Sequence, residues 1–296
     1  LSGFRKSFKI QNGNQTSGAG ATDEVFLTYN IEAQDLAQSG WDYTSSSSNI
    51  TLSFWVKSSV AQQFQVNMRL YPASGDQKEL CFEYTPSANT WTKVTKTIPG
   101  AAGNVLRNNN ELGMFIQFPQ FYGTDFTANS RPFDTWETKN NNQNYKDYAT
   151  NWYTTNDATW EITGLQLEVG STATDFEHRS FGEELYLCER YCQVLIAGLQ
   201  YYGTCMLYTG SVHTVASLWK KEMRATPSIV ANSGTNYYIT YRNGGNSQYN
   251  ALDGSLSTAS KRGGGVFTTG GTGTGGHAGA IAGYNSDTLV YIDAEL

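Results

Sequence analysis

Residues 64–71, FQVNMRLY, alternate strictly between apolar and polar side chains. Phe64, Val66, Met68 and Leu70 share one side of this pattern, and polar residues stand between them. Because successive side chains of a β-strand point to opposite faces, the pattern predicts a strand with one buried face. The same period recurs in FRKSFKI, EVFLTYNI, ITLSFWVKSS, ELCFEYT, TWTKVTKTIPG and LGMFIQFP. Many short alternating strands with turn residues between them predict an all-β chain that begins with an antiparallel sandwich.

The composition agrees with an ordered β-rich protein and excludes two classes of partner. Of the 296 residues, 14% are aromatic and only 16% are charged, which is not typical of a disordered chain. The net charge is −6 and no block of basic residues is present, so we expect no nucleic-acid partner. No apolar run approaches the roughly 20 residues of a membrane span, so we expect no membrane insertion.

The stretch 160–192 joins two parts of the chain. Apolar residues alternate up to Ile162 and resume one position later at Leu165, and the glycine between them, Gly164, predicts a β-bulge. Helical spacing follows over 183–192, where the apolar positions are Leu185, Cys188 and Cys192. We therefore expect a sandwich domain over 1–176, a linker with a short helix over 177–194, and a second, smaller β domain over 195–296.

This stretch also carries a resemblance to a known family. QLEVGSTATDFEHRSFGEELYLCERYC resembles a signature of phage tail-fibre and related virion structural proteins, with departures at Asp175 and Cys192. The residues in step are Gln166, Leu167, Glu168, Gly170, Ala173, Thr174, Phe176, Glu177, Arg179, Glu183, Glu184, Leu185, Cys188, Arg190 and Tyr191. In that family the signature joins a jelly-roll, carbohydrate-binding-module-like domain to a C-terminal β fibre domain. The resemblance extends over about residues 3–192, and a shorter match covers KKEMRATPSIV and the terminal YIDAEL.

The resemblance implies a non-enzymatic virion protein, the distal part of a tail fibre that recognises a host-surface glycan. It implies assembly in the host cytoplasm and contacts with other virion proteins. A purely structural component, such as a head fibre, decoration or baseplate protein, is the alternative, and a glycan-cleaving tailspike is a third. We also expect a homotrimer, since stiff fibres commonly close around a threefold axis. Its interface would be the apolar seam of the short helix, formed by Leu185, Cys188 and Cys192.

Aromatic residues of the long loop 119–158 are candidates for glycan binding. A sugar presents apolar C–H faces beside its hydroxyls, so its site needs flat rings next to amide or carboxylate side chains. The candidate rings and amides are Trp136, Tyr145, Trp152, Tyr153, Asn141, Asn142 and Asn151. The alternative is that these rings hold the loop against its own sandwich or a neighbouring subunit. A competing site at the fibre tip would use Tyr237 and Tyr238.

Catalytic and metal sites have little support in the sequence. The three histidines lie apart, and no Gly-x-Ser-x-Gly elbow or metalloprotease motif is present. Asp125, Asp134 and Glu137 are the one acidic set that suggests a glycosidase pair. Acidic residues in an Asn-rich loop are more often solvated or bound to calcium. The four cysteines lack the paired spacing of a zinc site. We expect no enzyme activity, no metal and no cofactor, and leave open a structural calcium ion.

Overall fold

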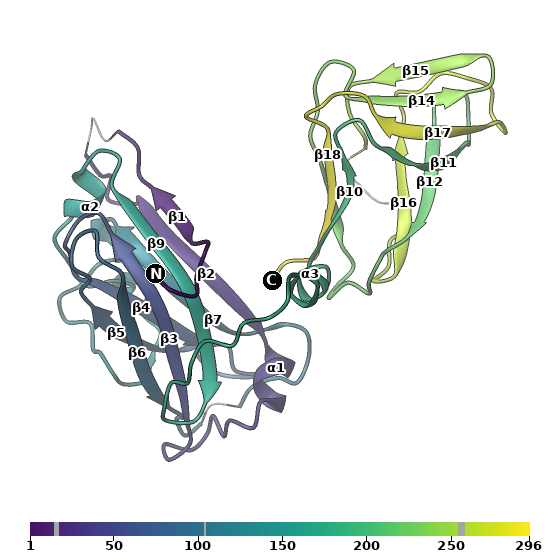
Figure 1. Cartoon of the computed structure of the whole chain (residues 1–296). Helices are drawn as coiled ribbons and strands as arrows, with labels where there is room; N and C mark the ends of the chain where they lie inside the picture. Colours follow the sequence, from purple (N-terminus) through teal and green to yellow (C-terminus); the bar gives the residue numbers. More distant parts are fainter. Residues whose placement is uncertain (15–17, 104, 254–257) are drawn as a thin grey trace. The chain divides into compact units, whose positions relative to one another are not determined.

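The computed structural model describes residues 1–14, 18–103, 105–253 and 258–296. Two compact units divide the chain, the first formed by residues 1–177 with Leu296 and the second by residues 178–295 (Figure 1). Both units are built almost entirely of antiparallel β-strands, as the alternating sequence predicts. No helix in the described ranges has both the length and the apolar character that crossing a membrane requires.

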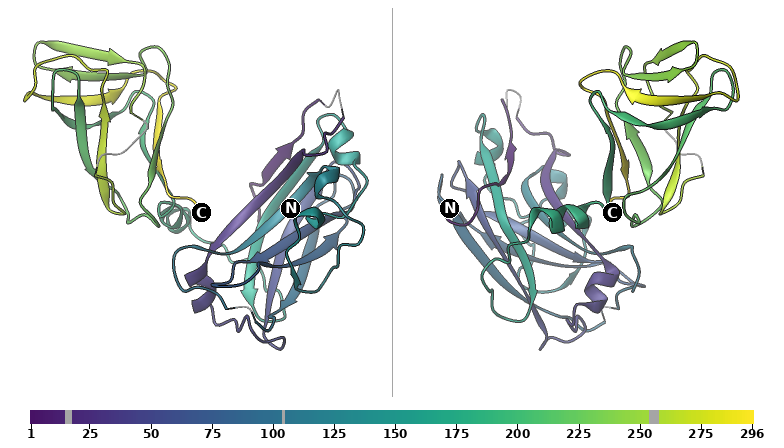
Figure 2. Two further views of the ribbon diagram at one scale, coloured as in Figure 1. Left: turned by 180° about the vertical axis from the view of Figure 1, so that it is seen from behind. Right: turned by 45° about the vertical axis from the view of Figure 1, so that its right-hand side comes forward.

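Two antiparallel sheets form the first unit and pack face to face (Figures 1 and 2). One sheet has the strand order β1-β9-β3-β6, and the other has the order β2-β7-β4-β5-β8, so the chain crosses repeatedly between sheets as in a jelly roll. The elements are β1 (Phe8–Gln11), β2 (Glu24–Glu32), α1 (Ala33–Gln38), β3 (Asn49–Ser58), β4 (Phe64–Leu70), β5 (Lys78–Tyr84), β6 (Thr92–Pro99), β7 (Leu112–Tyr122), η1 (Thr124–Phe126), β8 (Glu137–Thr138), η2 (Asn141–Gln143), α2 (Asn151–Thr154) and β9 (Thr159–Val169).

The core of this sandwich lies between the sheets. The apolar side of β4, from Phe64 to Leu70, is fully buried there, as its alternation predicts. Phe54 of β3 packs edge-on against Phe118 of β7, with 5.2 Å between the ring centroids, and thereby joins the two sheets. Leu167 of β9 is partly buried and packs against the same core.

The bulge predicted at Gly164 is present and shapes the strand β9. Ser53 pairs with Gln166 and Trp55 pairs with Thr163, so β9 advances three residues while β3 advances two. Gly164 has a φ of 61°, and a Cβ at this position would lie 2.7 Å from the ring of Phe4. Only glycine fits this left-handed conformation beside the ring without strain.

The second unit contains a three-stranded sheet of order β10-β18-β13 and a six-stranded sheet of order β15-β14-β17-β11-β12-β16. Its buried apolar residues form three separate clusters, which suits short strands interrupted by glycines. The elements are α3 (Phe181–Cys188), β10 (Cys192–Ala197), β11 (Tyr201–Leu207), β12 (His213–Leu218), β13 (Ser228–Ala231), β14 (Tyr238–Arg242), β15 (Gly245–Tyr249), β16 (Gly263–Thr268), β17 (Ala278–Gly283) and β18 (Leu289–Asp293).

The helix expected over 183–192 is shifted toward the N-terminus. It begins at Phe181, because Ser180 and Glu183 form a reciprocal capping box, and it ends at Cys188. Cys192 is instead the first residue of β10 and pairs with Asp293. The expected seam of three helical residues is therefore wrong at Cys192, since pairing with β18 overrides the helical spacing. Leu185 and Cys188 are exposed on the helix.

The buried positions predict a graded loss of stability. Phe64→Ala should lower the free energy of unfolding by about 3–5 kcal/mol, because it leaves a large cavity in the core. Leu167→Ala should cost only about 2 kcal/mol, since its side chain is partly exposed. Val169→Ala is the control on the same strand, and with a half-exposed side chain it should cost less than about 1 kcal/mol. Urea unfolding measures all three. Equal effects of Phe64→Ala and Val169→Ala would contradict the burial of Phe64 on the inner side of β4.

Candidate functional site

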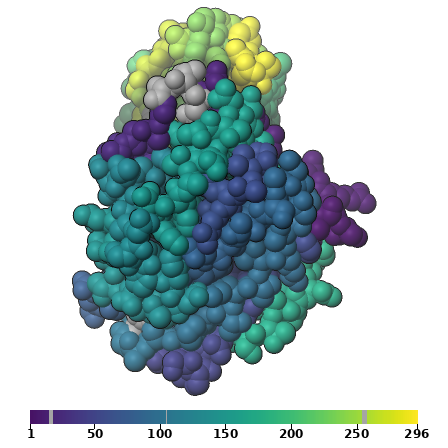
Figure 3. Space-filling model, turned by 90° about the vertical axis from the view of Figure 1, so that its left-hand side faces the viewer, coloured from purple at the N-terminus to yellow at the C-terminus, as the bar shows by residue number. Residues whose placement is uncertain are grey.

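The chain between β7 and β9 covers the outer face of the five-stranded sheet. Gln65 and Asn67 lie on the polar side of β4, yet both are fully buried. Their side-chain amides donate to the backbone carbonyl of Asn144, at 2.9 and 3.0 Å. The backbone N–H of Lys146 donates in return to Oε1 of Gln65, at 3.0 Å. These bonds fix residues 144–146 against the sheet. Figure 3 shows teal atoms of the later part of the first unit packed against blue atoms of its earlier part.

A buried ion cluster fixes the same covering segment further along. The Glu79 carboxylate on β5 is 1% exposed, and it accepts from Arg69 of β4 at 2.6 Å and from Arg131 of the covering segment. Arg131 also donates to the carbonyl of Gln143. Burial, reinforced by the charge of Glu79, raises the pKa of the neighbouring Cys81 thiol to about 12, so this thiol stays neutral at physiological pH.

Gln65, Asn67 and Glu79 are therefore covered, and a ligand cannot reach them in this conformation. A buried amide or carboxylate is costly unless it is hydrogen-bonded, and these groups find their partners in the covering segment. A pocket with polar lining lies instead at the end of β7, where the covering segment leaves the sheet.

A β-bulge shapes the end of β7. Val25 of β2 pairs with Phe121, but the next residue, Phe26, pairs with Pro119, so Gln120 is an extra residue between them. Phe121 turns into the core and stacks on Tyr153, with ring centroids 4.0 Å apart. Bulges re-aim side chains in this way, and here the bulge brings Gln120 to the wall of a pocket.

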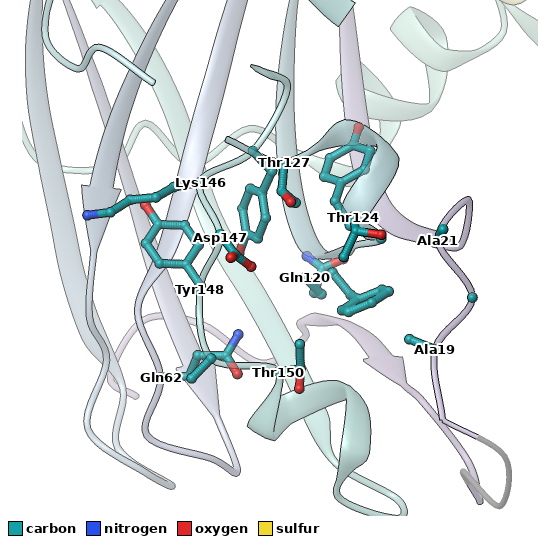
Figure 4. A pocket seen from close by; sticks show the side chains of 16 residues that line it. Ala19, Ala21, Gln62, Gln120, Thr124, Thr127, Lys146, Asp147, Tyr148 and Thr150 are labelled. Atoms are coloured by element: carbon teal, nitrogen blue, oxygen red, sulfur yellow. The ribbon is translucent and has the colours of Figure 1, made fainter. Parts of the chain in front are cut away.

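The pocket has a volume of about 230 Å³ and lies between the end of β7, the loop before β2 and the segment 145–150 (Figure 4). Its lining combines aromatic rings with amide, hydroxyl and carboxylate side chains. The lining residues are Ala19, Gly20, Ala21, Gln62, Gln120, Phe121, Tyr122, Gly123, Thr124, Thr127, Tyr145, Lys146, Asp147, Tyr148, Ala149 and Thr150.

Two buried polar atoms of the lining have no hydrogen-bond partner within the described protein. One is Oε1 of Gln120, whose amide nitrogen donates to the carbonyl of Phe118 at 2.7 Å. The other is the hydroxyl of Tyr145, a side chain that is 3% exposed. Burial raises the pKa of Tyr145, so its hydroxyl keeps its proton and can donate. Two residues of the lining thus carry a buried acceptor and a buried donor that no group of the described protein satisfies.

Tyr148 provides the partly exposed ring of the pocket. Its hydroxyl donates to the Glu83 carboxylate at 2.6 Å, and its ring packs edge-on against Tyr145, with 4.8 Å between the centroids. Burial and the bond to Glu83 raise the pKa of Tyr148 far above its ordinary value. The ring is therefore held in one orientation and stays neutral.

Of the seven residues predicted for the glycan site in the long loop, only Tyr145 lines this pocket. Trp152 is fully buried, and Tyr153 is 9% exposed with its hydroxyl bonded to Asp23. Both rings belong to the sandwich core, where the short helix α2 packs them against β7, and this burial fits the alternative that the rings hold the loop against its own sandwich. Trp136 packs partly against the core and donates to the carbonyl of Pro99. The three candidate asparagines, Asn141, Asn142 and Asn151, are exposed away from this lining.

The two tyrosines of the competing site at the expected fibre tip are also buried, fully or in part. Tyr238 is fully buried and its hydroxyl donates to the carbonyl of Asn232 at 2.6 Å, so it is wrong as a ligand-binding ring. Tyr237 is partly buried and packs against the same cluster as Tyr238. Alternation across β14 directs Tyr238 inward, where it stacks on Tyr249.

The three acidic loop residues lie in different surroundings, with Asp125 in the short helix η1. Asp134 is bound to Lys96 at 2.5 Å, and Glu137 lies on the short strand β8. Within the ranges that the structure describes, no three His, Cys, Asp or Glu side chains come together as metal ligands would. The pocket lining offers hydrogen bonds, ring contact and the charged groups of Lys146 and Asp147.

Sequence reasoning missed most of the pocket lining. The segment YKDY (145–148) contains the one useful signal, because Asp147 stands between two tyrosines in a polar loop. Gln120 interrupts an otherwise apolar strand end, which is a weak sign of a bulge. Gln62 and Thr124 carry no sequence signal, since only the folded chain brings them together.

No protein-family model matches the chain, and no curated protein matches it. Among solved structures, a family 16 carbohydrate-binding module matches with a TM-score of 0.29 and 10% identity, over 56% of this chain and 78% of that one. A tandem of family 22 carbohydrate-binding modules from Paenibacillus barcinonensis matches with a TM-score of 0.25 and 7% identity, over 99% and 97%. Discoidin II of Dictyostelium discoideum matches with a TM-score of 0.20 and 11% identity, over 100% and 85%. Similarity at this level says nothing of ligand or activity, so the function is argued from the residues.

The buried ion cluster predicts a large effect of one substitution. Arg131→Met should lower the free energy of unfolding by about 3 kcal/mol, because it removes one of the two cations that Glu79 meets in the interior. Arg107→Met is the control, since Arg107 and Glu111 form an exposed pair worth less than about 1 kcal/mol. Urea unfolding of both variants measures the difference. Equal stabilities would contradict a buried role for Arg131.

Proposed function

We propose that this chain is a non-enzymatic glycan-binding protein and that the pocket at the end of β7 holds a sugar residue. The observation that carries the proposal is the pair of buried, unsatisfied polar atoms on residues that line the pocket, Oε1 of Gln120 and the hydroxyl of Tyr145. A bound sugar hydroxyl can donate to the first and accept from the second. Such bonds would satisfy both groups, which are otherwise costly to bury.

The remaining lining also suits a sugar. Tyr148 offers a ring for the apolar C–H face, while Gln62, Thr124 and Thr150 offer groups that bond hydroxyls. The volume of about 230 Å³ is below the roughly 300–1,000 Å³ of pockets that enclose drug-sized ligands. The pocket therefore suits a single sugar residue, such as the end or a branch of a longer glycan.

The biological setting that we propose is a phage virion, with the chain forming the distal part of a tail fibre. The support is the resemblance of residues 164–192 to the tail-fibre signature. All four cysteines are free thiols, which suits assembly in a reducing cytoplasm. Host-surface glycan would then be the receptor, and other virion proteins would hold the fibre.

A purely structural virion role is the second candidate, and the surface of α3 favours it. Phe181 is 82% exposed, and Leu185, Tyr186 and Leu187 of the same helix are also exposed. Adjoining apolar side chains of this kind commonly mark a protein–protein interface. A homotrimer that buries α3 would use this surface and needs no ligand.

The double variant Tyr145→Phe, Gln120→Leu tests the glycan site. Both substitutions remove polar atoms while nearly keeping side-chain volume, so the fold should survive. Loss of the two hydrogen bonds should weaken glycan binding by about 1–3 kcal/mol. Glycan-array screening, followed by calorimetry with the best-bound saccharide, measures the effect.

Tyr237→Ala in the second unit serves as the comparison, because it tests the competing site. Unchanged affinity in the double variant, together with loss of binding in Tyr237→Ala, would move the site to the second unit. Absence of any glycan binding by the intact protein would favour the purely structural role.

A further inference from the structure

The charged groups of the described pocket lining are not equivalent, because the cation is paired with a described residue and the carboxylate is not. Lys146 is the only cation among the described residues of the lining, and its ammonium pairs with Glu83 at 3.1 Å. Figure 4 shows the Lys146 side chain extending away from the pocket, while the Asp147 carboxylate lies toward its middle. Asp147 is exposed and has no ion-pair partner among the described residues. The carboxylate is therefore the charge that a ligand meets.

Neighbouring acidic residues reinforce this field. Asp23 lies behind the loop that forms one wall, where its carboxylate accepts from the N–H of Gly20 at 2.8 Å. Asp125 follows the lining residue Thr124, and its N–H donates to the carbonyl of Ala21 at 3.0 Å. No second cation of the described lining opposes these charges. Acidic side chains therefore outnumber cations in and beside the described lining, and the amides and hydroxyls of the lining are neutral.

We propose that Asp147 sets the ligand class of this pocket, selecting neutral sugars and rejecting sugars that carry a carboxylate. This proposal rests on the proposed glycan binding. A carboxylate accepts hydrogen bonds from two hydroxyls at once, and such charge-assisted bonds are stronger than neutral ones. Toward a uronic or sialic acid the same group is repulsive, and an unpaired like charge is a common means of excluding a wrong ligand.

The neutral groups of the wall agree with this choice. An acidic sugar is usually held by arginine or lysine, and the one lysine here is already paired with Glu83. Gln120, Gln62 and the threonines can bond hydroxyls but cannot neutralise a carboxylate. Because Asp147 is exposed, solvent weakens the repulsion, and we expect about a tenfold preference for the neutral sugar.

Matched saccharide pairs that differ only in oxidation of C6, a hexose against its hexuronic acid, test the proposal on a glycan array. The intact protein should bind the neutral member about tenfold more tightly. Asp147→Lys should abolish or reverse this preference. Asp147→Asn should reduce it and also weaken binding of the neutral sugar, because the charge-assisted bonds are lost.

Glu137→Lys is the matched control, since it makes the same charge change at an exposed residue outside the pocket lining. It should keep the preference of the intact protein. An equal shift in Glu137→Lys and Asp147→Lys would overturn the proposal in favour of a general charge effect. A preference unchanged in Asp147→Lys, with binding still weakened by Tyr145→Phe, would overturn the role of Asp147 and leave glycan binding intact. Absence of binding to every saccharide would overturn both.

Discussion

The backbone carbonyl of Asn144, which accepts from the buried amides of Gln65 and Asn67, is the contact on which the first unit depends. These bonds join the middle of a long loop to the centre of a sheet, across 79 and 77 residues of chain. With the loop held there, the polar side chains of β4 and Glu79 of β5 become part of an interior. The pocket then forms where the loop leaves the sheet, between Tyr145 and the bulge at Gln120.

Strand β4 thus buries polar side chains toward the loop and apolar side chains toward the other sheet. Leaving a buried amide without a partner costs about 1–3 kcal/mol, so the covering segment and the face of β4 need one another. Removing the covering segment would also leave the buried Glu79 carboxylate without Arg131, one of the two cations that pair with it; the other is Arg69. The unit is thus a three-layer structure in which the third layer is a loop, and the geometry of the pocket is set by that layer.

Strand alternation was sufficient to predict the sandwich, the register of β4 and the bulge at Gly164, because these depend on local pattern. It was not sufficient for the site. The alternation of its neighbours predicts that Gln65 faces solvent, but Gln65 is buried by a segment that is distant in the chain. The sequence likewise predicts Trp152 in a loop, because its core partners are distant in the chain, although it belongs to the core. The helix ended early at Cys188 because Cys192 pairs with the C-terminal strand.

Amide hydrogen exchange at Lys146 tests the sealed layer most directly. Its N–H donates to Oε1 of Gln65, a bond that exists only while the loop lies on the sheet. The account predicts strong protection of this amide, since it exchanges only when the loop separates from the sheet. Exchange at the rate of an exposed loop amide would contradict it, because the polar face of the sheet would then be open to solvent and to ligands.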